Sequence, residues 1–280
     1  MSDTTVSSGL SSNSVVPRVT IVMPSFNEPP DVLRESLDSV AAQTMSDFEC
    51  MVIDESSMPE AAAACRALCE RDTRFRYVHP ETRIGLAGSL NLGLSMASAP
   101  LIARFDADDI CLPHRLERQV AFLDTHPDVG VLGGGLEIFT AEAGTIAIRN
   151  YPVDPDVIER HFQTTTPIAH PTVMMRKSVL DRFGVYDPSF RFAEDLDLWL
   201  RLLNHGVRFS NLPEVLVRYR QQSTARNPLH WTFNLRARIR NFSHRQFPLR
   251  VWGVLAIAAW RVIPKPIQEQ VFHWLLLRKR

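Results

Sequence analysis

The chain has 280 residues, of which 45% are hydrophobic and 22% are charged, and its formal net charge is zero. This length allows one large domain with an appendage or two small domains, and the apolar fraction excludes global disorder. The four cysteines are too few and too irregularly spaced for a disulfide framework, so we expect reduced thiols in a cytosolic protein.

Charge is distributed unevenly along the chain. Residues 218–280 hold 13 Lys and Arg against one acidic residue, Glu269, so the acidic excess lies in the remainder. The acidic first part of the chain is suited to binding metal ions, and the basic last part is suited to binding an anionic surface. Residues 1–16 are rich in serine, lack a signal-peptide pattern and are expected to form a disordered arm. The longest apolar run, 251–260, is too short for a membrane-spanning helix of about 20 residues.

Strand and helix patterns alternate through the first half of the chain. We predict strands at 18–24, 48–53, 75–78 and 101–105, and helices at 31–44, 60–70, 86–97 and from Pro113 onward. This order predicts an α/β fold with a mostly parallel central sheet flanked by helices. Ligands bind at the carboxyl ends of the strands in such sheets. Polar residues follow three of these strands, at 25–28, 54–57 and 106–109.

The second half of the chain shows a more mixed pattern. Residues 129–139 are predicted to form one or two strands, and 172–176 and 215–220 are short strands. Residues 194–204 form an amphipathic helix, because their apolar side chains recur at helical spacing. Beyond residue 221 the strand pattern stops.

The strongest local signal is the run Phe105-Asp106-Ala107-Asp108-Asp109, in which three carboxylates follow a buried strand. Neighbouring carboxylates repel each other unless a cation neutralises them. Hard oxygen ligands select Mg²⁺ or Mn²⁺, ions that commonly bridge to phosphate oxygens. A metal here could stabilise a diphosphate leaving group as a Lewis acid. The alternative interpretation is a solvated acidic turn ahead of the next helix.

Four segments occur together in one order, namely Val-Met-Pro-Ser-Phe-Asn-Glu at 22–28, Ile-Asp-Glu-Ser-Ser at 53–57, Asp-Ala-Asp-Asp at 106–109 and Glu194-Asp195. This set resembles the family 2 glycosyltransferases with the GT-A fold, most of all the bacterial members that build exopolysaccharide, capsule or lipopolysaccharide. The likeness covers residues 17–220 and is far more specific than any single motif. It implies a Rossmann-like GT-A catalytic domain over 17–225, with a nucleotide-binding half at 17–110 and an acceptor-binding half at 111–225.

The resemblance also implies a pocket for the nucleotide sugar. Its first part is formed by Pro24, Ser25, Asn27, Glu28 and Asp54, of which Asp54 recognises the base, usually uracil. A turn-forming aspartate is the alternative role for Asp54.

A second part of the expected pocket is formed by Arg83, Gly85 and Asn91, which lie in the segment that borders the nucleotide in the family. Gly85 allows close approach of the backbone to a ligand. Arg83 stands where asparagine is common, and it is either a phosphate partner or a surface arginine. Glu55 departs from the Asp-Asp pair of many relatives, which leaves its role open.

The run 106–109 matches the family's D-x-D motif. The resemblance makes Asp108 the direct ligand of Mn²⁺ or Mg²⁺ and places Asp106 on the ribose or sugar, within the same metal site. Ala107 lies between them against the donor. Asp109 either supports the metal site or caps the following turn.

Glu194 and Asp195 open the predicted helix at 194–204, a position where acidic residues are common for reasons of helix stability alone. The resemblance makes Asp195 the general base that deprotonates the acceptor hydroxyl, with Glu194 helping to hold the site. A single base opposite the leaving diphosphate implies inversion at the anomeric carbon. His170 contacts the diphosphate, the acceptor or the metal, or it is a structural histidine.

The expected function is transfer of a sugar from a nucleoside-diphosphate sugar, a UDP-sugar, to a glycan or lipid-linked oligosaccharide in cell-surface polysaccharide synthesis. The rivals are a sugar nucleotidyltransferase and a catalytically silent glycan-binding scaffold. The loop 25–28 has neither the glycine nor the lysine of a nucleotidyltransferase loop. The intact acidic pairs argue against a scaffold.

The last part of the chain, 226–280, interleaves aromatic residues with arginines. This composition predicts a basic, amphipathic helical tail that binds an anionic membrane surface, which would make the enzyme peripheral at the cytoplasmic face of the cell membrane. Packing on the catalytic domain or on a partner is the alternative. No nucleic-acid module precedes the tail, so we expect no nucleic-acid partner.

Overall fold

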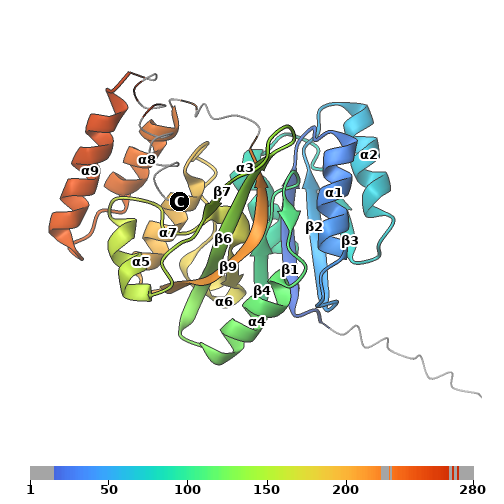
Figure 1. The fold of residues 1–280 in the computed structure, drawn as a ribbon, viewed down its shortest axis with the longest axis horizontal. Coiled ribbons are helices and arrows are strands. Elements are labelled where there is room, and N and C mark those ends of the chain that lie inside the picture. Colours follow the sequence, from blue (N-terminus) through green and yellow to red (C-terminus); the bar gives the residue numbers. More distant parts are fainter. Residues whose placement is uncertain (1–15, 222–226, 228, 265–266, 268–269, 271–280) are drawn as a thin grey trace, which may run out of the picture.

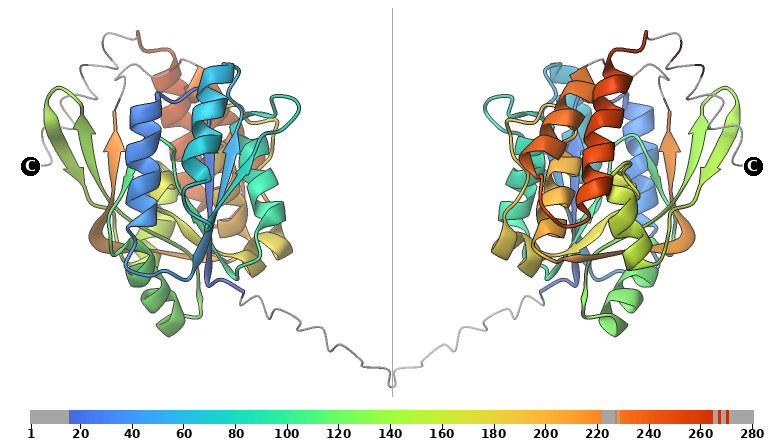
Figure 2. Two further views of the ribbon diagram at one scale, coloured as in Figure 1. Left: turned by 90° about the vertical axis from the view of Figure 1, so that its right-hand side faces the viewer. Right: turned by 90° about the vertical axis from the view of Figure 1, so that its left-hand side faces the viewer.

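The computed structural model describes residues 16–221, 227, 229–264, 267 and 270. Within this part of the chain, a nine-stranded sheet runs through the molecule with helices on both faces (Figures 1 and 2). Of the arm predicted at 1–16, the structure describes only Val16. In the tail predicted at 226–280, residues 226, 228, 265–266, 268–269 and 271–280 also lie outside the described part of the chain.

The first half of the chain forms four parallel strands in the spatial order β3-β2-β1-β4. They are β1 (Val19–Ser25), β2 (Phe48–Asp54), β3 (Phe75–Val78) and β4 (Leu101–Arg104). The intervening helices are α1 (Pro30–Ala41), α2 (Pro59–Cys69) and α3 (Gly85–Met96). Proline begins α1 and α2 because the first helical turn needs no N–H from it. These elements were all predicted, with bounds that differ by a few residues.

The second half makes the sheet mixed, so the expectation of a mostly parallel sheet holds for the first four strands but, among the described strands of the second half, for one pair alone. β8 (Met174–Arg176) lies antiparallel between β4 and β6 (Val129–Thr140). β7 (Gly144–Arg149) pairs antiparallel with β6 because a tight turn at Gly144, with φ +64°, joins them as a hairpin. β9 (Arg208–Arg220) runs parallel to β6 and antiparallel to β5 (Ile110–Cys111).

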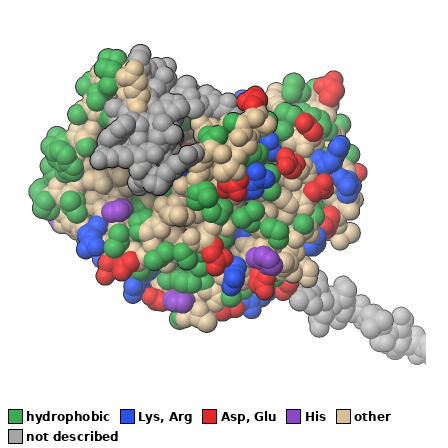
Figure 3. Space-filling view, in the orientation of Figure 1, with side chains coloured by type: hydrophobic (Ala, Val, Ile, Leu, Met, Phe, Trp, Pro, Cys, Tyr) green, Lys and Arg blue, Asp and Glu red, His purple; other side chains and the backbone are tan. Residues whose placement is uncertain are grey.

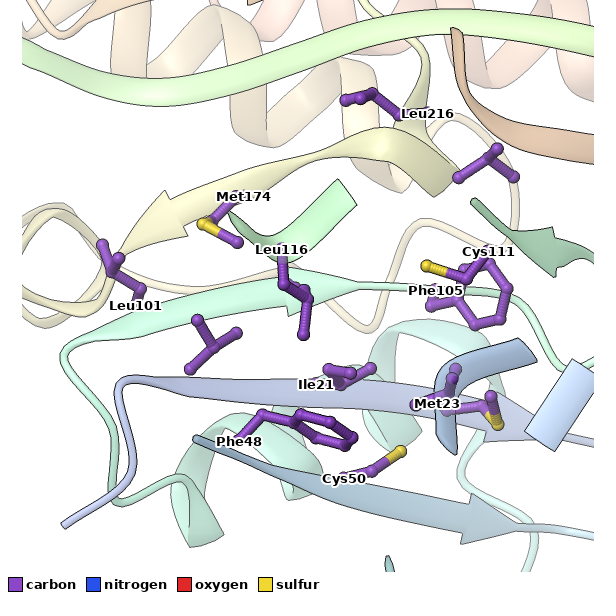
Figure 4. Packing of buried hydrophobic residues seen from close by; sticks show 14 of the residues in the cluster. Ile21, Met23, Phe48, Cys50, Leu101, Phe105, Cys111, Leu116, Met174 and Leu216 are labelled. Carbon is purple, nitrogen blue, oxygen red and sulfur yellow. The ribbon is translucent and has the colours of Figure 1, made fainter. Parts of the chain in front are cut away.

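Two apolar clusters cover the two faces of the sheet. On β1, Ile21 and Met23 belong to the cluster with α1, α2 and α4 (Arg115–Thr125), a part of which Figure 4 shows. Val22, between them, points to the other cluster. That second cluster contains α3, α5 (Pro155–Phe162), α6 (Lys177–Phe183) and α7 (Glu194–Asn204), with the fully buried Trp199 at its centre. All four cysteines are buried free thiols, as predicted.

The described part of the tail forms two helices, α8 (Leu229–Arg240) and α9 (Phe247–Arg261), which lie side by side next to α7 (Figure 1). Arg238 is buried and donates to the carbonyl oxygens of Phe162 and Gln163, both at 2.8 Å, at the end of α5. Arg250 is also buried and donates to Asn241 O at the end of α8. Cations at helix C-termini are stabilising because the last carbonyls carry partial negative charge. Arg250 also donates to Asn204 Oδ1 at 2.7 Å, so Arg238 docks the tail onto α5 and Arg250 docks it onto the end of α7.

Candidate active site

The loops after β1 and β2 meet through Asn27, whose backbone is left-handed with φ +55°. Asparagine tolerates this conformation better than most residues. The Asn27 amide N–H donates to Ser56 Oγ at 2.8 Å, and Asn27 Oδ1 accepts from the amides of Ser57 and Met58 at 2.9 and 3.1 Å. Two of the three polar segments predicted at the strand ends thus lie together at one edge of the sheet.

Asp54, at the end of β2, is fully buried and rigidly held. Its Oδ1 accepts from the amide and the hydroxyl of Ser56 at 3.0 and 2.6 Å, and its Oδ2 accepts from the Tyr77 hydroxyl at 3.1 Å. A carboxylate has about four acceptor positions, so capacity for one further N–H donor remains.

Glu55, whose role the sequence left open, holds the start of α3. Its Oε2 accepts from the backbone amides of Ile84 and Gly85 at 3.1 and 3.0 Å. A carboxylate is favoured there because the first amides of a helix have no partner within the helix and the macrodipole attracts negative charge. The Arg83 guanidinium lies 3.9 Å from the centre of the Phe26 ring and 3.8 Å from Glu55.

Two residues of the segment 83–91 differ in what they offer a ligand. Gly85 has φ +73°, and no atom lies within 4 Å of the position that a Cβ would take, so open space borders it. Asn91 uses both ends of its amide on the backbone of Tyr186, donating at 2.8 Å and accepting at 3.1 Å. The structure thus gives Asn91 a tethering role between α3 and the segment that leads to α7.

The acidic run 106–109 lies beside the loop after β1. Burial, followed by repulsion from Asp108 and Asp106, raises the pKa of the Glu28 carboxyl to about 7. Burial and the charge of Asp106 likewise raise the pKa of Asp108 to about 6. Asp109 is fully buried, and the same two causes raise its pKa. Because β4 is parallel to β1 and pairs Arg104 with Val22, the third polar segment leaves the same edge of the sheet as the other two, as predicted from the strand order.

Two arginines that we did not predict flank this acidic run. Arg104, the last residue of β4, is buried and forms an ion pair with Asp106. Arg220, from the end of β9, donates from Nε to Asp108 O at 2.9 Å and from its backbone amide to Asp109 Oδ1 at 2.8 Å. One signal was available for Arg104, because a charged residue interrupts the apolar strand 101–105.

Glu194 and Asp195 occupy the first turn of α7, which begins after a left-handed Ala193 with φ +56°. Asp195 Oδ1 accepts from the amide of Leu196 at 2.7 Å. Burial, followed by the charge of Asp195, raises the pKa of Glu194 to about 7. The two carboxylates therefore share a low-dielectric site, where one of them is easily protonated near neutral pH.

His170 links this acidic pair to the rest of the site. Its Nε2 lies 2.9 Å from the Tyr186 hydroxyl, and its Nδ1 lies 3.9 Å from Glu194 Oε1. Its ring also packs edge-on against Trp199. Burial, followed by the positive charge of Arg104, holds the pKa of His170 well below its usual range, so the ring is neutral. Tyr186 thereby connects Asn91, on α3, to His170.

The oxygen donors of Asp106 and Asp108 fit a hard divalent cation, although they do not enclose one. Among the described residues, no group of three or more His, Cys, Asp or Glu side chains gathers as a cation site. Mg²⁺ and Mn²⁺ are commonly held by one or two carboxylates, with substrate phosphates and water completing the shell. The residues present therefore suit a cation that a diphosphate helps to hold.

Comparison with known sequences identifies the family. Residues 20–184 match Glycosyl transferase family 2. The chain is 32% identical over 196 residues to the amylovoran biosynthesis glycosyltransferase AmsE of Erwinia amylovora, covering 70% of this chain and 73% of that protein. It is 27% identical over 202 residues to the UDP-Gal:alpha-D-GlcNAc-diphosphoundecaprenol beta-1,3-galactosyltransferase of Escherichia coli, covering 72% and 73%. The chain belongs to glycosyltransferase family 2.

Solved structures share the fold. S. aureus TarS 1–349 in complex with UDP-GlcNAc superposes with a TM-score of 0.65 at 17% identity, covering 85% of this chain and 71% of that one. The mannosyltransferase PcManGT from Pyrobaculum calidifontis, in complex with GDP-Man and Mn²⁺, gives 0.63 at 20% identity, covering 94% and 81%. The mixed sheet flanked by helices is therefore GT-A-like.

Proposed function

We propose that the protein transfers a sugar from a UDP-sugar, with inversion, to a hydroxyl group of a glycan or lipid-linked oligosaccharide in cell-surface polysaccharide synthesis. The observation that carries this proposal is the convergence of three polar loops, 25–28, 54–57 and 106–109, at one edge of the sheet. The names of AmsE and of the E. coli galactosyltransferase support the substrate class.

In this proposal the donor is bound by residues of the first half. The Asp54 carboxylate, held by Ser56 and Tyr77, accepts the N–H of uracil with its remaining capacity. Pro24, Ser25, Asn27 and Glu28 line the nucleotide, Gly85 lets the backbone approach it, and Arg83 and Ala107 border the diphosphate and the sugar.

Mn²⁺ or Mg²⁺ would be held by Asp108, with Asp106 beside it and the diphosphate oxygens completing the shell. When bound, the cation supplies Lewis-acid stabilisation of the departing diphosphate. PcManGT, a structural neighbour, is known in complex with Mn²⁺.

On the acceptor side, the Asp195 carboxylate takes the proton of the acceptor hydroxyl as that oxygen attacks the anomeric carbon. The bond from this carbon to the diphosphate oxygen breaks in the same step, which inverts the configuration. The buried Glu194, 3.9 Å from the neutral His170, supports Asp195 at the start of α7, and the partly exposed Asp195 remains open to the acceptor hydroxyl.

We further assign an anionic membrane surface as the partner of the tail. On α9, Trp252 and Leu255 are 64% and 58% exposed and lie about one helical turn apart, and Val262, just beyond the helix, is 81% exposed. Apolar side chains gather where α9 forms the left edge of Figure 3. Within the described residues, no helix is both long and apolar enough to cross a bilayer. Because 226–280 holds a single acidic residue among many basic ones, an anionic lipid surface complements it better than a second copy of the chain.

The mechanism is tested by Asp195→Asn, which removes the proton acceptor with little change in volume. We expect sugar transfer to fall by about 100- to 10,000-fold while UDP binding, measured by calorimetry, persists. Asp31→Asn is the matched control, because Asp31 is an exposed acidic residue in the first turn of another helix, α1. A nucleotidyltransferase would release no UDP from a UDP-sugar but would release pyrophosphate from UTP and a sugar 1-phosphate, and a scaffold would do neither.

A further inference from the structure

Arg104 is a buried cation in the middle of the sheet. It ends β4, between β1 and β8, and is only 4% exposed. Its amide donates to Val173 O at 2.9 Å, and its carbonyl accepts from Arg115 Nη2 at 2.7 Å, so the backbone that carries it is fixed. Burying a guanidinium is costly unless charged or polar partners compensate for the lost water, which calls for a reason at this position.

The guanidinium pairs with one acidic part of the site, and its strand packs against the turn that lies beside the other. One nitrogen, Nη1, pairs with the Asp106 carboxylate, and Nε is buried without a hydrogen-bond partner among the described residues. On the acceptor side, the Arg104 amide binds the carbonyl of Val173, which directly follows the turn His170–Thr172. His170 Nδ1 in turn lies 3.9 Å from Glu194 Oε1, and the Arg104 charge acts on both of these side chains. Arg104 is thus electrostatically coupled to both halves of the site.

A fixed positive charge at this point solves a physical problem of the site. Asp106, Asp108 and Asp109 come from one loop and Glu194 from α7, and four carboxylates in a poorly solvated region repel each other. Arginine stays ionised under all ordinary conditions and presents several N–H donors in a rigid plane. It can therefore hold a carboxylate in one orientation before any substrate has arrived.

We propose that Arg104 is a positioning residue that fixes Asp106 and joins the donor motif to the acceptor-side pair Glu194-Asp195. The inference rests on the proposed sugar transfer, and it assigns to Arg104 no contact with substrate. Arg104 fixes the orientation of the Asp106 carboxylate, whereas the Asp108 carboxylate remains available to bind the cation.

The test compares Arg104→Met, which removes the charge but keeps the length, with Arg104→Lys, which keeps the charge but loses the planar fork. Arg238→Met is the matched control, because Arg238 is equally buried and also donates to backbone carbonyl oxygens, but those carbonyls belong to Phe162 and Gln163 at the end of α5. For each folded variant, kcat and KM for the UDP-sugar are measured, and the affinity for Mn²⁺ alone is measured by electron paramagnetic resonance.

We expect Arg104→Met to lower kcat by about 10- to 100-fold, as is usual when the partner of a site carboxylate is removed. Mn²⁺ should bind at least as tightly as in the wild type, because a positive charge near the carboxylates has gone. Arg104→Lys should recover part of kcat, and Arg238→Met should lower thermal stability while leaving kcat near the wild-type value.

Three results would overturn the inference: a wild-type kcat in Arg104→Met, loss of Mn²⁺ binding together with activity in that folded variant, or a lysine variant no better than the methionine one. If Arg104→Met does not fold, Arg104→Lys decides, since a wild-type kcat there shows that the fork geometry is not needed. Failure of the wild type to release UDP from any donor would instead refute the proposed function, and the Mn²⁺ comparison would still report on Arg104.

Discussion

Replacing Gly253 by alanine should detach α9 from the catalytic domain, although the same change stabilises most helices. Gly253 is the buried contact point of α9, and it faces the backbone that follows α5. An alanine methyl there would overlap the Gln163 carbonyl oxygen, and it would lie 2.9 Å from the Gln163 carbonyl carbon and 3.6 Å from Thr164 Cα. These are backbone atoms, and Arg238 holds the same carbonyl group at 2.8 Å, so the neighbours have little freedom to move.

The expected magnitude follows from two opposing terms. Glycine to alanine in an exposed helix gains about 1 kcal/mol of stability. Overpacking of a fixed contact costs about 1–3 kcal/mol. The net effect of Gly253→Ala should therefore be a loss of up to about 2 kcal/mol in the free energy of unfolding, or a separation of α9 from its site. The exposed Ala259→Gly, on the outer side of the same helix, should cost about 1 kcal/mol through helix propensity alone.

The assay is urea unfolding followed by tryptophan fluorescence, together with limited proteolysis of the native protein to detect a detached helix. Gly253→Ala should unfold at lower urea than the wild type or be cleaved faster near α9. An increase in stability of about 1 kcal/mol without faster cleavage would refute the docked position of the tail.

Two further changes test the membrane surface and the acidic pair. Trp252→Glu should weaken co-sedimentation with vesicles that contain anionic lipid by about tenfold or more, because burying such a side chain contributes about 1.5–3 kcal/mol. The control Ile148→Glu, at an exposed residue on β7, should bind the vesicles as the wild type does. Equal binding of the wild type, Trp252→Glu and Ile148→Glu would contradict the assignment of α9. Burial and the charge of Asp195 raise the pKa of Glu194 to about 7, so the rate of sugar transfer should fall as the pH drops through about 7 and Glu194 becomes protonated. The contribution of Glu194 to folding stability has the opposite dependence, because a raised pKa favours the protonated folded state, and it should be lost as the pH rises through about 7. A profile of kcat/KM against pH that is identical for the wild type and Glu194→Gln would refute this.

The first half of the fold could be predicted because its signals are local. Strand β1 and helix α1 show clear periodicity, and the three polar loops follow from the rule that parallel strands end at one edge. The second half depends on contacts between distant segments. β8 inserts antiparallel between β4 and β6, and no local pattern of three residues specifies such a partner.

The acidic residues of the candidate site carry a signal in the sequence, whereas the groups that hold them do not. Glu55 accepts a hydrogen bond from the start of α3, about 30 positions away, and Asn91 donates one to the Tyr186 backbone, about 95 positions away. The arginines of the tail were expected at a surface, yet Arg238 and Arg250 are buried at helix ends. Composition indicates that a segment is basic, but it does not reveal which charges find partners inside the fold.

The central claim is metal-assisted transfer from a nucleotide sugar, and release of UDP from a panel of UDP-sugars tests it most directly. The measurement uses the full chain with Mn²⁺ or with EDTA, and it compares the wild type with Asp108→Ala. We predict release from one or a few donors that requires the metal and disappears in Asp108→Ala. Release that is equal with EDTA or in the variant would contradict the assignment of Asp108, and no release from UDP-, GDP- or dTDP-sugars would contradict the proposed reaction.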